Sequence, residues 1–393
     1  MGSITFGGRG GSKKMKIEQK RWTEENGWVP ELKGVVDEAV QLVLLFGSTQ
    51  LLKDLAYIHD IKAAYPKAHI FGCSTAGEIC GTQVTDNSLV ITAIKLESTQ
   101  IKGTQVKINS SLDSFQAGEV LAKSLETDDL AHIIVLSDGR NVNGSDLVRG
   151  LTKNLPQGVL ITGGLAGDGE RFQETLTFLD DVPARDTIAV LGLYGKRLKV
   201  GYGSLGGWDS FGPERLITRS KGNILYELDG KSALELYKKY LGEHAKNLPA
   251  SGLLFPLSLR TGEGESGLIR TILSINEEEQ SLTFAGDVPE GAYARLMKAN
   301  FDRLIDGAIG AAKKSYIAIG SFSPELAILV SCVGRKMILN QRTEEEVEGV
   351  RDILGDKTVL AGFYSYGEIC PSNLGTKCEL HNQTMTITAL SEK

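Results

Sequence analysis

The chain has few cysteines, no long apolar run and no secretory signal, and each absence excludes a class of protein. Its five cysteines among 393 residues are an odd number without a Cys-x-x-Cys pair, which fits a reducing compartment better than a disulfide scaffold. No run of about 18 apolar residues is present, so we expect no membrane-spanning helix. Residues Met1 to Ser12 are rich in glycine and lack an apolar core, which argues against a signal peptide. We therefore expect a cytoplasmic protein that does not bind a membrane.

A basic stripe and a phosphate-binding loop are also missing. The net charge is −6 and the basic cluster at residues 13–16 is short, so nucleic-acid binding is not expected. No Gly-x-x-x-x-Gly-Lys-[Ser/Thr] sequence occurs, which argues against a nucleotide phosphate loop. We interpret Cys370 and Cys378 as small buried side chains and expect no metal site. The composition, with 41% hydrophobic and 23% charged residues, is that of a soluble protein of two or three domains.

The chain does contain a nine-residue sequence motif that occurs twice. Residues 72–80 read GCSTAGEIC, and residues 362–370 read GFYSYGEIC. Each copy follows an apolar strand and precedes another, and the second strands end in the similar sequences 91–94 (ITAI) and 387–390 (ITAL). An internal repeat of this kind indicates that one α/β unit was used at least twice, with a carboxylate on the loop that leaves a strand.

The order strand, helix, strand, Gly-acid loop, strand is expected three times. In the middle unit the loop is Gly163 to Asp168, where Ala166-Gly167-Asp168 aligns with Ala76-Gly77-Glu78. Residues 201–213 hold five glycines and are expected to be a loop or a crossover. The strands that we expect are 42–46, 68–71, 89–96, 133–136, 159–162, 187–194, 326–331 and 359–361, with helices at 50–64, 146–155, 233–241, 300–314 and 344–354.

These patterns predict an α/β fold of two domains built from repeated strand–helix–strand units with mixed sheets. We interpret residues 1–30 as a flexible leader or tag. A domain boundary near residue 215 divides the remainder into domains 31–215 and 216–393. We expect a ligand cleft between the two domains, lined by the Gly-acid loops.

The repeated loops are the first candidate site, because ligands of open α/β sheets bind beyond the carboxyl ends of the strands. Four hydroxyl groups are expected to contact polar ligand atoms, those of Ser74, Thr75, Ser365 and Tyr366. The carboxylates of Glu78 and Glu368 are expected to accept hydrogen bonds from an ammonium group. The alternative for both loops is a tight turn that is braced by its own glutamate.

Other polar side chains also stand near strand ends. Asp138 and Asn143 precede a helix whose N-terminus favours an anionic group, although a turn with an N-cap satisfies the same residues. Arg335 follows an apolar strand, where it either clamps a ligand carboxylate or forms an ion pair at the surface or a domain interface. An enzyme would need a nucleophile such as Cys73 beside a base such as His381, and nothing in the sequence brings these two together. We therefore expect that the protein is not an enzyme.

Several motifs together resemble those of the FIST family, in the order in which the family has them. Residues 72–79 resemble the signature of the FIST N-terminal domain, and residues 219–231 resemble the start of the FIST C-terminal domain. Residues 331–335, 362–371 and 380–384 resemble the later motifs of that domain. The resemblance spans roughly residues 33 to 390.

The resemblance implies a sensory module for small ligands, with amino acids as a proposed ligand class. Because the FIST-like part fills nearly all of the chain, the resemblance implies either a signal passed in trans to an output protein, such as a histidine kinase or a diguanylate cyclase, or no signal at all. Some stand-alone members bind haem and respond to nitric oxide. That alternative requires one of the five histidines as an axial ligand, of which His381 lies in a family motif. Any haem would be noncovalent, because no Cys-x-x-Cys-His sequence is present.

The sequence leaves open the ligand's identity, the oligomeric state and whether the two GEIC loops share one pocket. From the loops and the family motifs together, the ligand-contacting residues that we predict are Cys73, Ser74, Thr75, Glu78, Asp138, Asn143, Gly164, Asp168, Arg335, Tyr364, Tyr366, Glu368, His381 and Asn382.

Overall fold

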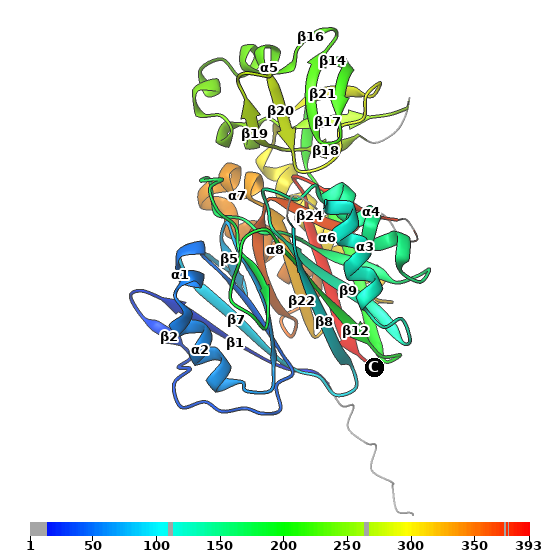
Figure 1. Ribbon diagram of the computed structural model, residues 1–393. Coiled ribbons are helices and arrows are strands. Elements are labelled where there is room, and N and C mark those ends of the chain that lie inside the picture. Colours follow the sequence, from blue (N-terminus) through cyan, green and yellow to red (C-terminus); the bar gives the residue numbers. More distant parts are fainter. Residues whose placement is uncertain (1–13, 109–112, 263–266, 373–374, 376) are drawn as a thin grey trace, which may run out of the picture.

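A computed structural model of the chain describes residues 14–108, 113–262, 267–372, 375 and 377–393. Three six-stranded sheets form the body of the molecule, and one eight-stranded sheet forms a separate domain above the body in Figure 1. The expected α/β class with mixed sheets is confirmed. Among the described residues, no helix has the length and the apolar character needed to cross a membrane.

Each sheet of the body is centred on one repeated unit, in which two parallel strands are joined by an antiparallel third. The first unit has β3 (Leu42–Gly47), β4 (His69–Ser74) and β7 (Leu89–Lys95), with α1 (Thr49–Lys53) and α2 (Leu55–Ala64). The second unit has β9 (Leu130–Ser137), α4 (Gly144–Asn154), β10 (Leu160–Leu165) and β12 (Thr187–Tyr194). The third unit has β22 (Leu326–Cys332), α7 (Val333–Leu339), α8 (Thr343–Leu354), β23 (Val359–Ser365) and β26 (Met385–Glu392).

Each unit also contributes strands to the sheet of another unit, directly after its Gly-acid loop. From the first unit, β5 (Glu78–Cys80) pairs with β23, and β6 (Gln83–Thr85) pairs with β5. From the second unit, β11 (Thr177–Leu179) pairs with β4. From the third unit, β24 (Gly367–Pro371) pairs with β10, and β25 (Cys378–His381) pairs with β24. Main-chain hydrogen bonds therefore join the three units in a ring.

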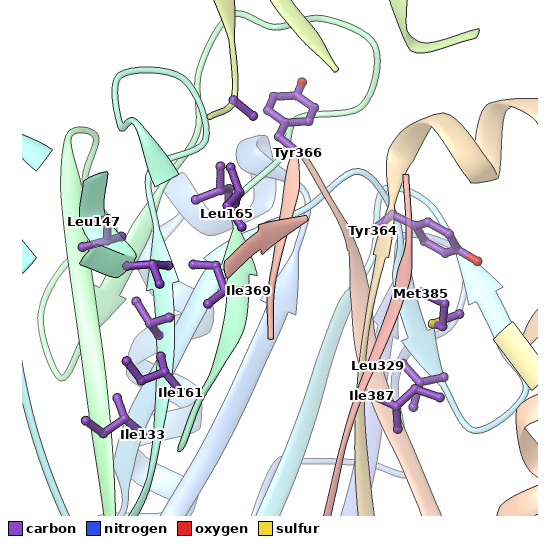
Figure 2. Close-up of a cluster of buried hydrophobic side chains, with 14 of the residues drawn as sticks. Ile133, Leu147, Ile161, Leu165, Leu329, Tyr364, Tyr366, Ile369, Met385 and Ile387 are labelled. Atoms are coloured by element: carbon purple, nitrogen blue, oxygen red, sulfur yellow. The ribbon is translucent and has the colours of Figure 1, made fainter. Parts of the chain in front are cut away.

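The central strands are buried on both faces, which explains why they read as continuous apolar runs. In β9, Ile134 and Leu136 point to a core shared by the three sheets, whereas Ile133 and Val135 point to the covering helices. Phe46 and Phe363, from the first and third units, meet in the shared core with their ring centroids 4.7 Å apart. Figure 2 shows part of the hydrophobic cluster on the helix-covered side of the sheets, with residues such as Leu147 of α4 and Ile161 of β10.

The remaining elements extend the three sheets and build the separate domain. In the body these are β1 (Lys16–Thr23), β2 (Gly27–Val29), β8 (Gln100–Lys107), α3 (Ser114–Ser124), β13 (Leu198–Leu205) and α6 (Phe301–Ala318). The inserted domain, which we define as residues 208–299, has β14 (Trp208–Lys221), β15 (Ile224–Leu228), β16 (Lys231–Ser232), α5 (Ala233–Leu241), β17 (Leu257–Arg260), β18 (Leu268–Arg270), β19 (Ile272–Asn276), β20 (Ser281–Phe284) and β21 (Tyr293–Ala299).

Two of the expected boundaries are wrong. Residues 16–23 are not part of a flexible leader, because they form β1 and pair along their length with β7; Met1 to Lys13 lie outside the described residues. The boundary near residue 215 falls inside β14, because this strand runs unbroken from Trp208 to Lys221. The structure divides the chain differently, into a three-sheet body and a domain inserted into it.

The glycine-rich stretch 201–213 is mostly strand and not loop, since it forms the end of β13 in the body and the start of β14 in the inserted domain, and it crosses from one to the other. Its glycines allow α6 to lie directly on β13. A Cβ atom added at Gly201 would come within 2.1 Å of the Ser315 carbonyl oxygen, and one at Gly203 within 2.2 Å of the Ala311 carbonyl oxygen. The glycines therefore mark a close approach of helix and strand and not chain flexibility.

Substitution of Gly203 by alanine is expected to lower the free energy of unfolding by about 1–3 kcal/mol, because the clash is with helix backbone that no side-chain rotation relieves. Urea denaturation would measure the loss. Gly206→Ala is the matched control, because a Cβ atom there meets nothing closer than 3.5 Å. Equal stability of the two variants would show that α6 does not lie this close to β13.

Candidate functional site

The Gly-acid loops of the three units contact one another at the ends of their strands. The backbone of Ala76 donates to the Tyr364 carbonyl at 2.8 Å, and the Tyr364 amide donates to the Gly77 carbonyl at 2.8 Å. The Gly167 amide donates to the Ser74 carbonyl at 2.9 Å. The two GEIC loops are thus packed against each other and against the middle loop.

Glu78 and Glu368 occupy equivalent positions and brace their loops in the same way. Glu78 accepts hydrogen bonds from the Thr75 hydroxyl (2.5 Å) and from the Ser88 amide and hydroxyl (3.3 and 2.5 Å). Glu368 accepts from the Ser365 hydroxyl (2.6 Å) and from the Thr384 amide and hydroxyl (3.1 and 3.0 Å). Both carboxyls are buried, and burial raises the pKa of Glu78 to about 7 and that of Glu368 to about 8, against the lowering effect of these donors.

Asp168 is the third repeated acid, and it braces the middle loop. It accepts from the amides of Phe172, Gln173 and Glu174 at 2.8–2.9 Å and from the hydroxyl of Tyr366. Its carboxylate therefore ties the loop of the second unit to that of the third.

The other predicted residues of the loops and strand ends hold internal contacts as well. Asp138 accepts from the amides of Arg140 and Asn141 at 2.8 Å, as a turn residue does. The Ser74 hydroxyl donates to the Gly167 carbonyl at 2.8 Å. Gly164 lies in β10, where an added Cβ atom would come within 2.6 Å of Val330. Cys73 is buried in the shared core, which raises the pKa of its thiol well above the ordinary value.

Arg335 and Tyr364 share one buried carboxylate, that of Glu346. The guanidinium of Arg335 donates to Glu346 at 3.1 and 2.7 Å, and the hydroxyl of Tyr364 donates to it at 2.7 Å. The remaining guanidinium bonds reach the Gly206 and Leu304 carbonyls. Arg335 is thus engaged within its own chain, in a fully buried ion pair and not in the surface or domain-interface pair that was one of the two possibilities from the sequence.

A cavity of about 890 Å³ lies between the body and the inserted domain. Its walls include Ser145 and Arg149 of α4, Lys314 of α6, and several residues of β17, β18 and β25. Of the fourteen predicted contact residues, His381 and Asn382 line it, and Asn143 stands at its edge as a partner of Asp287. The carboxylates of the Gly-acid loops are not among its lining residues, because strand exchange buries them.

The most unusual wall residue is Arg270, which the sequence reasoning missed. It is 3% exposed, and its guanidinium donates to the carbonyls of Asp287 (3.0 Å), Leu380 (3.0 Å) and Ile269 (3.3 Å) and to the Ser145 hydroxyl (3.2 Å). Within the described residues it has no carboxylate partner at ion-pair distance. Burial lowers its pKa to about 10, partly offset by the nearby charges of Asp287 and Glu379.

A signal for Arg270 does stand in the sequence. It interrupts the apolar run LIRTIL of residues 268–273, and a charge inside a buried strand is rare unless the charge is paired or functional. Asn143 caps α4 by accepting from the amides of Ser145 and Asp146, and this leaves the Ser145 hydroxyl to Arg270 and to the Asp287 amide.

The cavity walls do not fit a haem. His381 is the one histidine among the described lining residues, and burial lowers its pKa to about 4, so the ring is neutral. Its Nε2 atom lies 2.9 Å from the Cys370 carbonyl oxygen. A haem needs a free histidine nitrogen in an apolar pocket, whereas this nitrogen is engaged and the lining beside the ring includes Glu379, Asn382 and Thr384.

Comparisons with known proteins give a family and one relative. The FIST N domain matches residues 41–231, and the FIST C domain matches residues 233–371. An uncharacterized protein of Methanocaldococcus jannaschii is 23% identical over 350 residues, which is 81% of this chain and 65% of the length of that protein. The chain thus spans less than two thirds of this relative.

Two solved structures are also similar. A chorismatase crystal structure has 10% sequence identity and a TM-score of 0.35, over 96% of this chain and 100% of that chain. A cyanuric acid hydrolase from A. caulinodans has 7% identity and a TM-score of 0.38, over 96% of this chain and 99% of that chain.

Proposed function

The chain belongs to the FIST family, and we propose that it senses a small carboxylate-bearing, amino-acid-like ligand in the cavity between its body and its inserted domain. FIST domains are generally sensory, signal-transduction domains. The signal passes in trans to a separate output protein such as a histidine kinase or a diguanylate cyclase. The role is binding and not catalysis; Cys73, the nucleophile considered from the sequence, is buried away from the cavity.

The observation that carries the proposal is the buried guanidinium of Arg270. A charge that has lost its water is stabilised far better by an anion than by neutral carbonyl groups, and guanidinium matches a carboxylate in shape as well as in charge. Its carbonyl partners belong to the inserted domain and to β25, and its hydroxyl partner belongs to α4. A carboxylate bound here therefore contacts the body and the inserted domain at once.

The cavity also connects to the braced loops, which gives a ligand a means of changing the body. Asn382 lines the cavity and donates to the Tyr366 carbonyl at 3.1 Å, and the Tyr366 hydroxyl in turn holds Asp168. Thr384 lines the cavity and holds Glu368. A ligand shifts an equilibrium only by its differential affinity for the two states, and these contacts are where such a difference would arise.

The test is a thermal-shift screen with the L-amino acids and, in parallel, the corresponding amino-acid amides, which lack the carboxylate. We expect the acids and not the amides to raise the melting temperature. For the best acid, Arg270→Met should weaken binding roughly 10- to 100-fold in calorimetry, because it removes charge-assisted hydrogen bonds.

The control for this variant is Arg295→Met, in the same domain but outside the cavity lining, where the guanidinium donates to the Gly212 carbonyl at 2.9 Å. Arg270→Lys keeps the charge without the planar fork and checks that the fold survives. Stabilisation by acids and amides alike would overturn the proposal, as would equal affinity in the well-folded Arg270→Met and Arg295→Met proteins.

A further inference from the structure

We infer that the ligand carries two separated acidic groups, one bound by Arg270 and the other by Lys314, so that the ligand class is a dicarboxylate or a comparable dianion. This inference rests on the proposed function, because it concerns the same cavity. It adds a second anchoring residue and a requirement on the charge and length of the ligand. Neither Arg270 nor Lys314 was singled out from the sequence.

Lys314 is the second basic side chain of the cavity wall without a carboxylate partner in the described part of the chain. It lies on α6, and its amino group donates to the Ser204 carbonyl at 3.3 Å, a long hydrogen bond that uses one of its three protons. Lys313, the next residue of the helix, is exposed to solvent and is not part of the lining. Of these two neighbouring lysines of α6, Lys314 therefore lines the cavity and Lys313 does not.

The other charged groups of the wall are already engaged. Arg149 forms ion pairs with Asp146 and with Asp287, at 2.5 Å for the latter. The second oxygen of Asp287 accepts from Asn143 at 2.7 Å. Arg260 holds Glu214 with two bonds, at 2.7 and 2.6 Å. Glu379 is exposed and accepts from the Ser372 hydroxyl at 2.7 Å.

The cavity wall also carries neutral polar groups. Burial lowers the pKa of His381, and the charges of Arg270 and Lys314 on the same wall lower it further. Asn382 and Thr384 stand beside His381 on the wall. Among the described residues the cavity thus has two basic side chains without a carboxylate partner, and its volume of about 890 Å³ far exceeds that of a single carboxylate.

Calorimetry with a series of dicarboxylates tests the inference, using malonate, succinate, glutarate and adipate, each beside the monocarboxylate of equal chain length. We expect one dicarboxylate to bind at least about tenfold more tightly than its monocarboxylate. Lys314→Met should reduce that dicarboxylate to the affinity of the monocarboxylate and leave the monocarboxylate unchanged. Lys313→Met is the matched control and should behave as the wild type.

The outcomes separate this inference from the proposed function. If monocarboxylates bind as tightly as dicarboxylates, depend on Arg270 and ignore Lys314, the dianion inference is wrong while the proposed site stands. If inorganic phosphate binds more tightly than every dicarboxylate and depends on both residues, the separation of the two acidic groups is wrong. If neither these acids nor the amino acids bind, or if binding ignores Arg270, the proposed function fails as well.

Discussion

Replacing Glu346 by glutamine is expected to lower the free energy of unfolding by about 3–5 kcal/mol. Glu346 and Arg335 are both fully buried, 0% exposed, and the closest contact between them is 2.7 Å. Removal of one charge leaves the other desolvated without a partner, which costs far more than the intact pair contributes. The effect reaches α7, α8 and α6 together, since Arg335 also donates to the Leu304 carbonyl at 2.6 Å. Guanidinium denaturation with a global fit would measure it.

The double variant Arg335→Met/Glu346→Gln checks the reason for this loss. It removes both charges and keeps an acceptor for the Tyr364 hydroxyl, so we expect it to be more stable than either single variant. Glu345→Gln is the control, because its pair with Arg342 is exposed and is expected to contribute little to stability. Single variants that lose no more than this control would contradict a buried ion pair.

The repeated unit could be predicted from the sequence because its strands are buried on both faces. Runs such as 42–46 and 187–194 become β3 and β12 almost to the residue. The pairing of the exchanged strands could not be predicted. Nothing in residues 78–80 distinguishes pairing with the sheet of their own unit from pairing with β23, some 280 residues away, because hydrogen-bonding potential is the same along every strand edge.

Because strand exchange could not be predicted, most of the predicted site residues are not those that line the cavity. The sequence marked Glu78, Asp168 and Glu368 because acids at strand ends often face ligands, and strand exchange instead enclosed all three among their own hydroxyl and amide donors. His381 and Asn382 were found through a family motif. Arg270 comes from an edge strand of the inserted domain and Lys314 from a helix of the body, and only the packing of the inserted domain on the body brings them to one cavity.

Between about pH 6.5 and 8.5 the wild-type protein is expected to lose on the order of 2–3 kcal/mol of unfolding free energy, and the double variant Glu78→Gln/Glu368→Gln is expected to lose little. In the fold the pKa of Glu78 is about 7 and that of Glu368 about 8, above their ordinary value of 4.5. The folded protein keeps protons that the unfolded chain has already released. Stability is therefore complete below the unfolded pKa and is lost as the pH rises through the folded values.

Two histidines have the opposite effect on the pH dependence of stability at lower pH, and this sets the pH range in which the carboxyls are measured. Burial lowers the pKa of His132 to about 3 and that of His381 to about 4, below their ordinary value of 6.5. Below pH 6.5 these two histidines bind protons in the unfolded chain but not in the folded protein. Their contribution therefore makes the free energy of unfolding rise with pH. From pH 4.5 to 6.5 the effect of the histidines on stability opposes that of the buried carboxyls. Above pH 6.5 the effect of the buried carboxyls remains. His69, whose pKa is raised by its hydrogen bond to Asp180, adds a smaller downward slope to every variant.

Glutamine is a fair replacement at both positions because each carboxyl has one oxygen that faces a lone hydroxyl. Thr75 and Ser365 donate to that oxygen now, and a hydroxyl reverses to accept from an amide group, whereas the other oxygen keeps its amide and hydroxyl donors. Urea denaturation at half-unit pH steps would compare the wild type, the double variant and Glu25→Gln, an exposed control. A wild-type slope that persists in the double variant would show that other groups carry it, and the two carboxyls would then be ionised braces at neutral pH.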